Sequence, residues 1–213
     1  MRLLLIGPPG CGKGTQAVHI AQHYGVEHIS SGDLLRRHVA QRTSIGRTVE
    51  QCINRGDLVS DGIVMDILRR PVEAASRRGG YILDGFPRTV EQAEAAYDVA
   101  KTLDASVRIA LHLQVPAEEL IRRPLARGRE TERADDTAES STTDSRSSTR
   151  PPCLCWTTTP TGRPLVRIDG NGPVEEVTRS AITQLDHVRR RLGLETTTVR
   201  TPRQSAPPSV RRT

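Results

Sequence analysis

The chain has 213 residues, a formal net charge of +6 at pH 7 and an aromatic content of only 2%. This length predicts one α/β domain, or one with small inserts, whose core is built from Leu, Ile, Val and Ala because aromatic side chains are scarce. No apolar run approaches the roughly 18 residues that span a membrane, so we predict no membrane partner. The opening residues lack the cleavage pattern of a signal peptide. We therefore expect a cytoplasmic protein.

The charge and the cysteines each suggest a partner that other features argue against. A net charge of +6 would suit nucleic acid, or a phosphate-rich small ligand. Much of the excess lies close to the end of the chain, so we do not predict nucleic acid as a partner. The four cysteines lack paired spacing, and Cys153-x-Cys155 has no second pair. We therefore predict reduced thiols and no zinc.

The first motif is a glycine-rich loop, GPPGCGKGT at residues 7–15, which directly follows the apolar run 3–6. This order predicts a buried strand, a tight turn and a helix start, where backbone amides form a nest for phosphate oxygens. Lys13 would add a mobile positive charge, and the Thr15 hydroxyl would face Mg²⁺. The loop departs from G-x-x-x-x-G-K-[ST] because Gly14 stands at the Ser/Thr position. The alternative is a glycine-rich turn without a phosphate role.

The segments that follow alternate between helix and strand patterns. We expect a helix over 16–24 that buries Val18, Ile20 and Ala21, with Gly25 as its C-terminal cap. A short strand at 26–29 then leads into a helix that starts with capping serines within 30–36.

The central part of the chain predicts a helix over 61–68 and two further strands, at 81–83 and 107–115. Asp84 stands at the carboxyl end of the first of these strands. Open parallel sheets bind ligands at this end of their strands, and an aspartate there can hold Mg²⁺ through water.

Two motifs together resemble one known family. GPPGCGKGTQA at residues 7–17 and YILDGFPRT at residues 81–89 resemble the phosphate loop and the AMP-binding turn of the adenylate kinases, within the nucleoside monophosphate kinases. The resemblance covers about residues 1–136, fails across a middle segment and returns from about 165 to 192. It implies a three-layer α/β fold of the P-loop nucleoside-triphosphate-hydrolase type, with a parallel sheet, an AMP-binding helical insert and a short lid. It also implies a monomer that transfers a phosphoryl group reversibly from MgATP to AMP, giving two ADP.

By this resemblance, residues 1–194 form one adenylate kinase-like domain and residues 195–213 a disordered basic tail. Within the domain, the core comprises 1–29, 60–122 and 165–194. The AMP-binding insert is 30–59, and the short lid, of the type without zinc, is 123–137.

The resemblance also implies a set of site residues. ATP would be bound by Gly10, Cys11, Gly12, Lys13, Gly14, Thr15, Arg123, Arg127 and Gly172. AMP would be bound by Ser31, Arg36, Asp57, Leu58, Val59, Gly85, Phe86, Pro87, Arg88, Gln92 and Arg133. The catalytic residues would be Lys13, Arg88, Arg127 and Arg133, and Asp84 would hold Mg²⁺ through water. The bland alternatives are a solvated helix arginine for Arg36 and a surface glutamine for Gln92.

Within residues 1–136, three positions depart from the family pattern. Ser31 stands where threonine is more usual, and Ser60 where proline is common. Pro124 stands where leucine is typical; a proline inside a helix costs about 3 kcal/mol or introduces a kink. A kink there would change the aim of Arg123 and Arg127.

Residues 140–164, SSTTDSRSSTRPPCLCWTTTPTGRP, have no helical apolar period. Their composition predicts a flexible loop, but a loop this long is unusual inside a compact domain. The family places a long helix here. The same nucleotides, read one base earlier with free choice of synonymous codons, can encode VIDNRLAVFHETT over 140–152 and PLLDYY over 154–159, which resemble that helix. We infer two compensating frameshifts, near Glu139 and Arg163; the alternative is a genuine disordered insert.

The segment 140–164 contains position 144, where the family has an arginine that binds phosphate and this chain has Asp144. The difference affects the predicted catalytic rate. An arginine on the transferring phosphoryl group can be worth about 10³-fold in rate. An alternative function is therefore a nucleotide-binding protein with impaired or no catalysis. A UMP/CMP kinase is the other alternative, which Gln92 and the DGFPRT motif argue against.

Regular patterns resume after residue 164. We expect a last strand at 165–170 and a turn at 171–173 that contacts the ATP adenine near Gly172. An amphipathic helix over 174–192 follows, with a basic end that suits the helix dipole.

Overall fold

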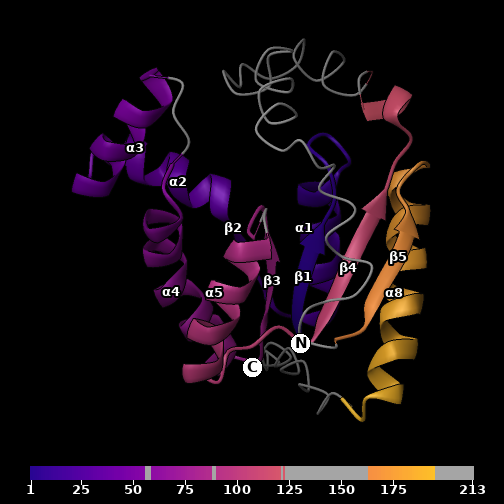
Figure 1. The fold of residues 1–213 in the computed structure, drawn as a ribbon. Coiled ribbons are helices and arrows are strands. Elements are labelled where there is room, and N and C mark those ends of the chain that lie inside the picture. The colour runs from indigo at the N-terminus through magenta and orange to yellow at the C-terminus, as the bar shows by residue number, and fades with distance from the viewer. Residues whose placement is uncertain (56–58, 88–89, 121, 123–162, 195–213) are drawn as a thin grey trace, which may run out of the picture.

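The computed structural model describes residues 1–55, 59–87, 90–120, 122 and 163–194 (Figure 1). Within these residues, five strands form one sheet in the order β2-β3-β1-β4-β5, and every neighbouring pair is parallel. The strands are β1 (Arg2–Ile6), β2 (Glu27–Ser30), β3 (Tyr81–Asp84), β4 (Ile109–Gln114) and β5 (Leu165–Asp169). The carboxyl ends of all these strands therefore lie along one edge of the sheet, where ligand sites of open parallel sheets are found.

Helices cover both faces of the sheet and make the three layers that the sequence predicts (Figure 1). They are α1 (Lys13–Tyr24) and α8 (Val174–Arg191) on one face, and α4 (Asp61–Arg77) and α5 (Val90–Thr102) on the other. Side chains of β1 alternate between the two layers: Leu3 and Leu5 pack with α1 and α8, and Leu4 and Ile6 pack on the side of α4. Because both faces are buried, this strand is apolar throughout.

Two further helices, α2 (Ser31–Ala40) and α3 (Ser44–Arg55), extend from the carboxyl edge of the sheet beside α4 (Figure 1). Ser30 caps α2, because its side chain accepts a hydrogen bond from the amide of Asp33. α3 packs tightly on α2: a Cβ on Gly46 would lie only 2.0 Å from the carbonyl oxygen of His38. Only glycine allows this approach.

The sequence predictions for α1 are partly confirmed. Gly25 ends the helix in the left-handed conformation, as expected. The prediction that Val18 is buried is wrong, since Val18 is 43% exposed. The helix buries Ile20 and Ala21, as predicted, together with Gln16 and Ala17. These four lie on one face at helical spacing, and Val18 points to the other side.

The helix that starts at Asp61 is longer than the sequence predicts. The apolar spacing predicts helix over 61–68, whereas α4 continues to Arg77 and contains Pro71. Val72 and Ala75 extend its buried face beyond the proline.

Three observations bear on the expected partners. No helix in the described part of the chain is both long and apolar enough to cross a membrane. Cys11 and Cys52, the cysteines within the described ranges, are free thiols. Among the same residues, no group of three or more His, Cys, Asp or Glu side chains could hold a metal ion.

Candidate active site

The glycine-rich loop connects the end of β1 to the start of α1. Gly10 and Gly12 have φ values of 78° and 95°, which side chains with a Cβ rarely adopt. Gly12 is the N-cap residue of α1, and the described residues provide no side-chain cap hydrogen bond there. The first amides of α1 also lack acceptors within the helix, so they form the anion-binding end of the helix. The structure thus has the strand–loop–helix arrangement that the motif predicts.

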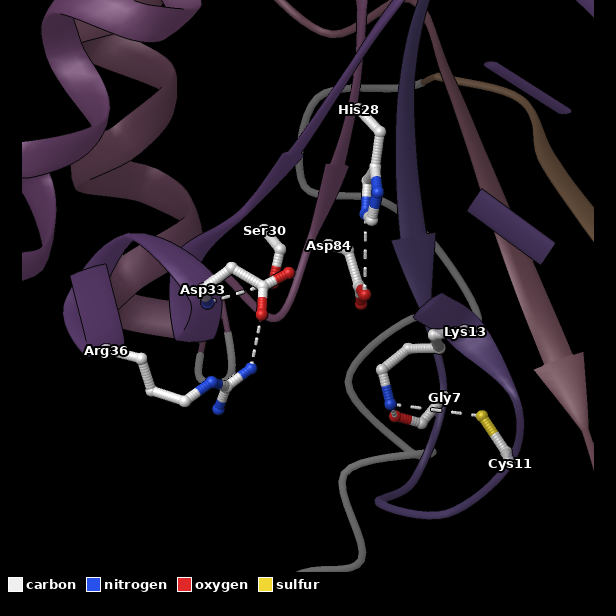
Figure 2. Close-up of polar contacts among 8 residues, drawn as sticks. All are labelled: Gly7, Cys11, Lys13, His28, Ser30, Asp33, Arg36 and Asp84. Carbon is white, nitrogen blue, oxygen red and sulfur yellow. Dashed lines mark hydrogen bonds and ion pairs between the residues drawn. The ribbon is translucent and has the colours of Figure 1, made fainter. Parts of the chain in front are cut away.

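Lys13 is folded back onto this loop. Its Nζ donates to the carbonyl oxygens of Gly7 and Pro8, each at 2.9 Å, and lies 3.9 Å from Sγ of Cys11. Figure 2 shows the contacts with Gly7 and Cys11. These acceptors are neutral, and a phosphate oxygen would make a stronger, charge-assisted bond. The ammonium is therefore held at the loop by acceptors that a phosphate can replace.

Asp84 ends β3 and is only 8% exposed. Its Oδ2 lies 3.8 Å from Nε2 of His28, and a Cβ on Gly14 would lie 3.7 Å from the same oxygen. The carboxylate is therefore beside the first turn of α1. Its other oxygen, Oδ1, has no hydrogen-bond partner among the described residues. A buried carboxylate oxygen without a partner is costly, so this oxygen fits a water bound to Mg²⁺.

The chain turns directly after Asp84. Gly85 has a φ of 83°, and a Cβ there would lie 2.6 Å from Oγ of Ser31. The structure therefore brings Gly85 against Ser31, at the start of α2; both are residues predicted on the AMP side. The peptide bond between Phe86 and Pro87 is cis. Phe86 is 3% exposed and belongs to the core beneath α4, so any contact of Phe86 with AMP would come from its backbone.

Two other residues predicted on the AMP side contact acidic side chains. Nη2 of Arg36 donates to Oδ1 of Asp33 at 2.5 Å (Figure 2), and Nε2 of Gln92 donates to Oδ1 of Asp61 at 2.6 Å. Burial alone would raise the pKa of Asp33, but the hydrogen bond and the charge of Arg36 lower this pKa below its usual value. Arg36 and Gln92 are thus oriented by carboxylates, with which a bound nucleotide would compete.

The turn after β5 lies beside the glycine-rich loop. The amide of Gly170 donates to the carbonyl oxygen of Gln114 at 2.7 Å, and a Cβ on Gly170 would lie 3.7 Å from the carbonyl oxygen of Cys11. Gly172 follows in the exposed turn that leads into α8. The predicted adenine-contacting turn and the phosphate loop are therefore at the same edge of the sheet.

Comparison with known proteins assigns the family. A family model described as adenylate kinase matches residues 5–198. The chain belongs to the adenylate kinase family. Members of this family are phosphotransferases that act on nucleotides.

Several curated adenylate kinases are similar to this chain. That of Trichodesmium erythraeum is 36% identical over 193 residues, which cover 88% of this chain and 99% of the relative. That of Acetivibrio thermocellus is 46% identical over 123 residues, which cover 58% of this chain and 57% of the relative. That of Synechococcus sp. strain RCC307 is 45% identical over 138 residues, which cover 65% of this chain and 72% of the relative. The alignment thus spans little more than half of the Acetivibrio protein.

Several predicted adenylate kinase site residues lie outside the described residues. They are Asp57, Leu58, Arg88, Arg123, Arg127 and Arg133. Val59 is described, and it is partly buried directly before the start of α4. The lid at 123–137 and the segment from 140 to 162 are also outside the described part.

His28 is the site residue that the sequence reasoning missed. It lies two positions before Ser30 on β2, so both side chains fall on the same face of the sheet. The sequence carries one feature that could have indicated His28: it is a polar residue near the carboxyl end of a predicted strand, and ligand sites of open parallel sheets lie at that edge. The pairing of Arg36 with Asp33 was equally accessible, since the two are three residues apart on one helix.

An apolar cavity of about 110 Å³ lies away from the phosphate loop, between α4, α5 and the sheet. Leu68, Val72, Phe86 and Tyr97 are among its lining residues. Tyr97 also lies beneath the guanidinium of Arg163, at 5.4 Å from the ring centroid. Its apolar lining makes this cavity a packing feature rather than part of the nucleotide site.

Proposed function

We propose that this chain transfers the terminal phosphoryl group of MgATP to AMP, reversibly, giving two ADP. The observation that carries the proposal is the meeting of three elements at one sheet edge: the phosphate loop with Lys13, the buried carboxylate of Asp84, and the Ser31–Gly85 turn. Family membership supports phosphotransfer between nucleotides. The choice of AMP as acceptor rests on Gln92 and on the DGFPRT motif.

The ATP side of the proposal is built on α1 and the loop before it. The amides from Gly10 to Thr15 would bind the phosphate oxygens, and Lys13 would leave the carbonyls of Gly7 and Pro8 to follow the transferring phosphoryl group. The turn at Gly172 would contact the adenine. Arg123 and Arg127 would complete this side from the proposed lid, 123–137.

Mg²⁺ fits this site as a partner of ATP. Asp84 would hold it through water, and the Thr15 hydroxyl would face it. When bound, Mg²⁺ neutralises charge on the phosphate oxygens. Before the nucleotide arrives, the position of the Asp84 carboxylate is set by the protein, beside Gly14 and His28.

The AMP side lies on the proposed insert, 30–59, and on the turn after β3. Ser31 would face the adenosine, Arg36 and Arg88 the α-phosphate, and Gln92 the adenine edge. The backbone of Val59 and its neighbours Asp57 and Leu58 would line the base. The AMP phosphate is already an anionic nucleophile, so the reaction needs no general base. Arg88 and Arg133 would neutralise charge as the two phosphates approach.

The proposal includes a monomer in the cytoplasm, without nucleic acid or membrane as partner. The free thiols of Cys11 and Cys52 are compatible with a reducing compartment.

One sequence feature favours a second candidate, a nucleotide-binding protein with impaired catalysis. Asp144 stands where the family has a phosphate-gripping arginine. An aspartate would repel phosphate, and the loss could reach about 10³-fold in rate.

A coupled assay of ADP formation tests the proposal and separates the candidates. AMP, UMP and CMP are compared as acceptors, for the chain as written, for Lys13→Ala and for a version with the restored reading frame at 140–159. We expect AMP to be preferred, Lys13→Ala to lower the rate at least about 10²-fold, and the restored frame to raise it. Nucleotide binding without turnover in the chain as written would instead support the binding-protein candidate, and preference for UMP or CMP would overturn the assignment of the acceptor.

A further inference from the structure

His28 and Asp84 face each other across two neighbouring strands. β2 and β3 are parallel, with Ser30 opposite Asp84 and His28 opposite Ile82. His28 is thus the diagonal neighbour of Asp84 on the same face, within reach of a long side chain. Figure 2 shows the imidazole pointing at the carboxylate.

Both side chains are largely withdrawn from solvent. The exposed fraction is 19% for the His28 side chain and 11% for the Asp84 side chain. Nε2 of His28 and Oδ1 of Asp84 are buried and lack hydrogen-bond partners within the described part of the chain. Buried polar atoms of this kind are normally paired directly or through ordered water. The separation of 3.8 Å between Nε2 and Oδ2 exceeds a hydrogen bond, which requires about 3 Å.

Two other polar side chains near Asp84 already make hydrogen bonds elsewhere. Nζ of Lys13 donates to the loop carbonyls, and Oγ of Ser30 accepts from the amide of Asp33. Among the described residues, His28 is the side chain whose contact with this carboxylate leaves it able to orient Asp84.

We propose that His28 is a positioning residue for Asp84: its Nε2–H donates to the carboxylate, directly after a small rotation or through one water, and so aims the carboxylate at the water of the nucleotide-bound metal. The inference rests on the proposed function, because that function assigns the metal to Asp84. Partners of metal-binding carboxylates typically change metal affinity 10- to 100-fold when they are removed. His28 would act on metal-dependent nucleotide binding and leave metal-free binding to the loop and Lys13.

The experiment measures two affinities for each variant of the full chain. Calorimetry in EDTA gives the affinity for metal-free ATP, and electron paramagnetic resonance of Mn²⁺ gives the metal affinity of the ATP complex. His28→Ala removes the donor, and His28→Gln returns an N–H near the place of Nε2. The matched control is His112→Gln. His112 is a buried histidine whose Nε2, like that of His28, has no partner in the described residues, but it lies on the opposite face of the sheet from Asp84.

We expect His28→Ala to weaken Mn²⁺ binding about tenfold with little change in metal-free ATP binding, His28→Gln to restore most of the loss, and His112→Gln to change neither affinity. Unchanged Mn²⁺ affinity in His28→Ala would overturn the inference, as would equal losses of both affinities without rescue by glutamine. If His28→Ala does not fold, His28→Asn replaces it: its shorter amide cannot reach the place of Nε2, so it must bind Mn²⁺ more weakly than His28→Gln. A wild-type chain that binds ATP equally with and without metal would overturn the proposed metal role itself, which is a different result from failure of His28 alone.

Discussion

Gly85 is a residue whose identity the structure explains completely. Its φ of 83° is unfavourable for other residues, and an added Cβ would come within 2.6 Å of the Ser31 hydroxyl. Gly85→Ala should therefore destabilise the fold by about 2 kcal/mol and raise the KM for AMP, because Ser31 has to move. Urea unfolding and initial-rate measurements check both effects.

Gly62 is the matched control for this substitution. It lies in the first turn of α4, and a Cβ there would meet nothing within 4 Å. Gly62→Ala should leave the KM for AMP unchanged and stabilise the fold by up to about 1 kcal/mol, because alanine favours helix. Equal behaviour of the two variants would show that the close approach at Gly85 is unimportant.

At the residue scale, the sequence predicted the parts of the site that depend on backbone geometry. The loop at 7–15 and the turn at Gly85 could be predicted because glycines, a lysine and an aspartate at these spacings are typical of a phosphate-binding loop and of a turn after a strand. The partner of Gln92 was missed because Gln92 and Asp61 are far apart in sequence and meet only in the fold. The partner of Arg36 was missed although Asp33 lies three residues before it on the same helix. His28 was missed because no local motif marks it.

Among the strands, the pair β4 and β5 contains a buried histidine. His112 lies opposite Arg167 in the register. Burial, and then the charge of Arg167, lower the pKa of His112 below its usual value. The folded protein therefore binds fewer protons at His112 than the unfolded chain, in which the pKa is near 6.5.

This difference gives a pH dependence with a definite sign. Stability should fall as the pH drops below about 6.5, by at most about 1.4 kcal/mol per pH unit from this residue, until the lowered folded pKa is reached. His112→Gln should flatten that dependence. Urea unfolding at pH 7.5 and pH 5.5 measures it, and parallel pH profiles for the two proteins would show that His112 does not contribute.

At the element scale, periodicity located the strands and helices but not all their boundaries or faces. The apolar runs at β1, β3 and β4 are confirmed because both faces of a parallel sheet are buried. Val18 was placed on the wrong side of α1, since the buried face there includes Gln16. Gln16 bonds the carbonyl oxygen of Val174 and the hydroxyl of Thr178 on α8, a contact between elements that local sequence does not contain.

At the scale of the whole molecule, the fold was predicted from two motifs that resemble one family. A family model that matches residues 5–198 supports that resemblance. The fold of residues 140–164 could not be predicted in this way, because their composition contradicts the helix that the family resemblance implies. Lid, insert and tail boundaries therefore stay predictions.

The inferred frameshifts make a direct prediction about the natural protein. The chain as written has one tryptophan, Trp156. In the shifted frame the bases of its codon fall into leucine and aspartate codons, so tryptophan is lost. Protein purified from its source organism should then show no tryptophan fluorescence and should yield the peptide LLDYY on mass spectrometry. Detection of a peptide containing Trp156 would support the genuine insert instead.

The central claim is that one edge of the sheet holds a nucleoside triphosphate next to a nucleoside monophosphate. Calorimetry with two adenosines joined by five phosphates tests this most directly. The account predicts binding of one molecule per chain, weakened about 10- to 100-fold by Lys13→Ala through the lost charge-assisted hydrogen bonds, and unchanged by Gly62→Ala. No binding by the wild-type chain, or equal affinity in Lys13→Ala, would contradict it.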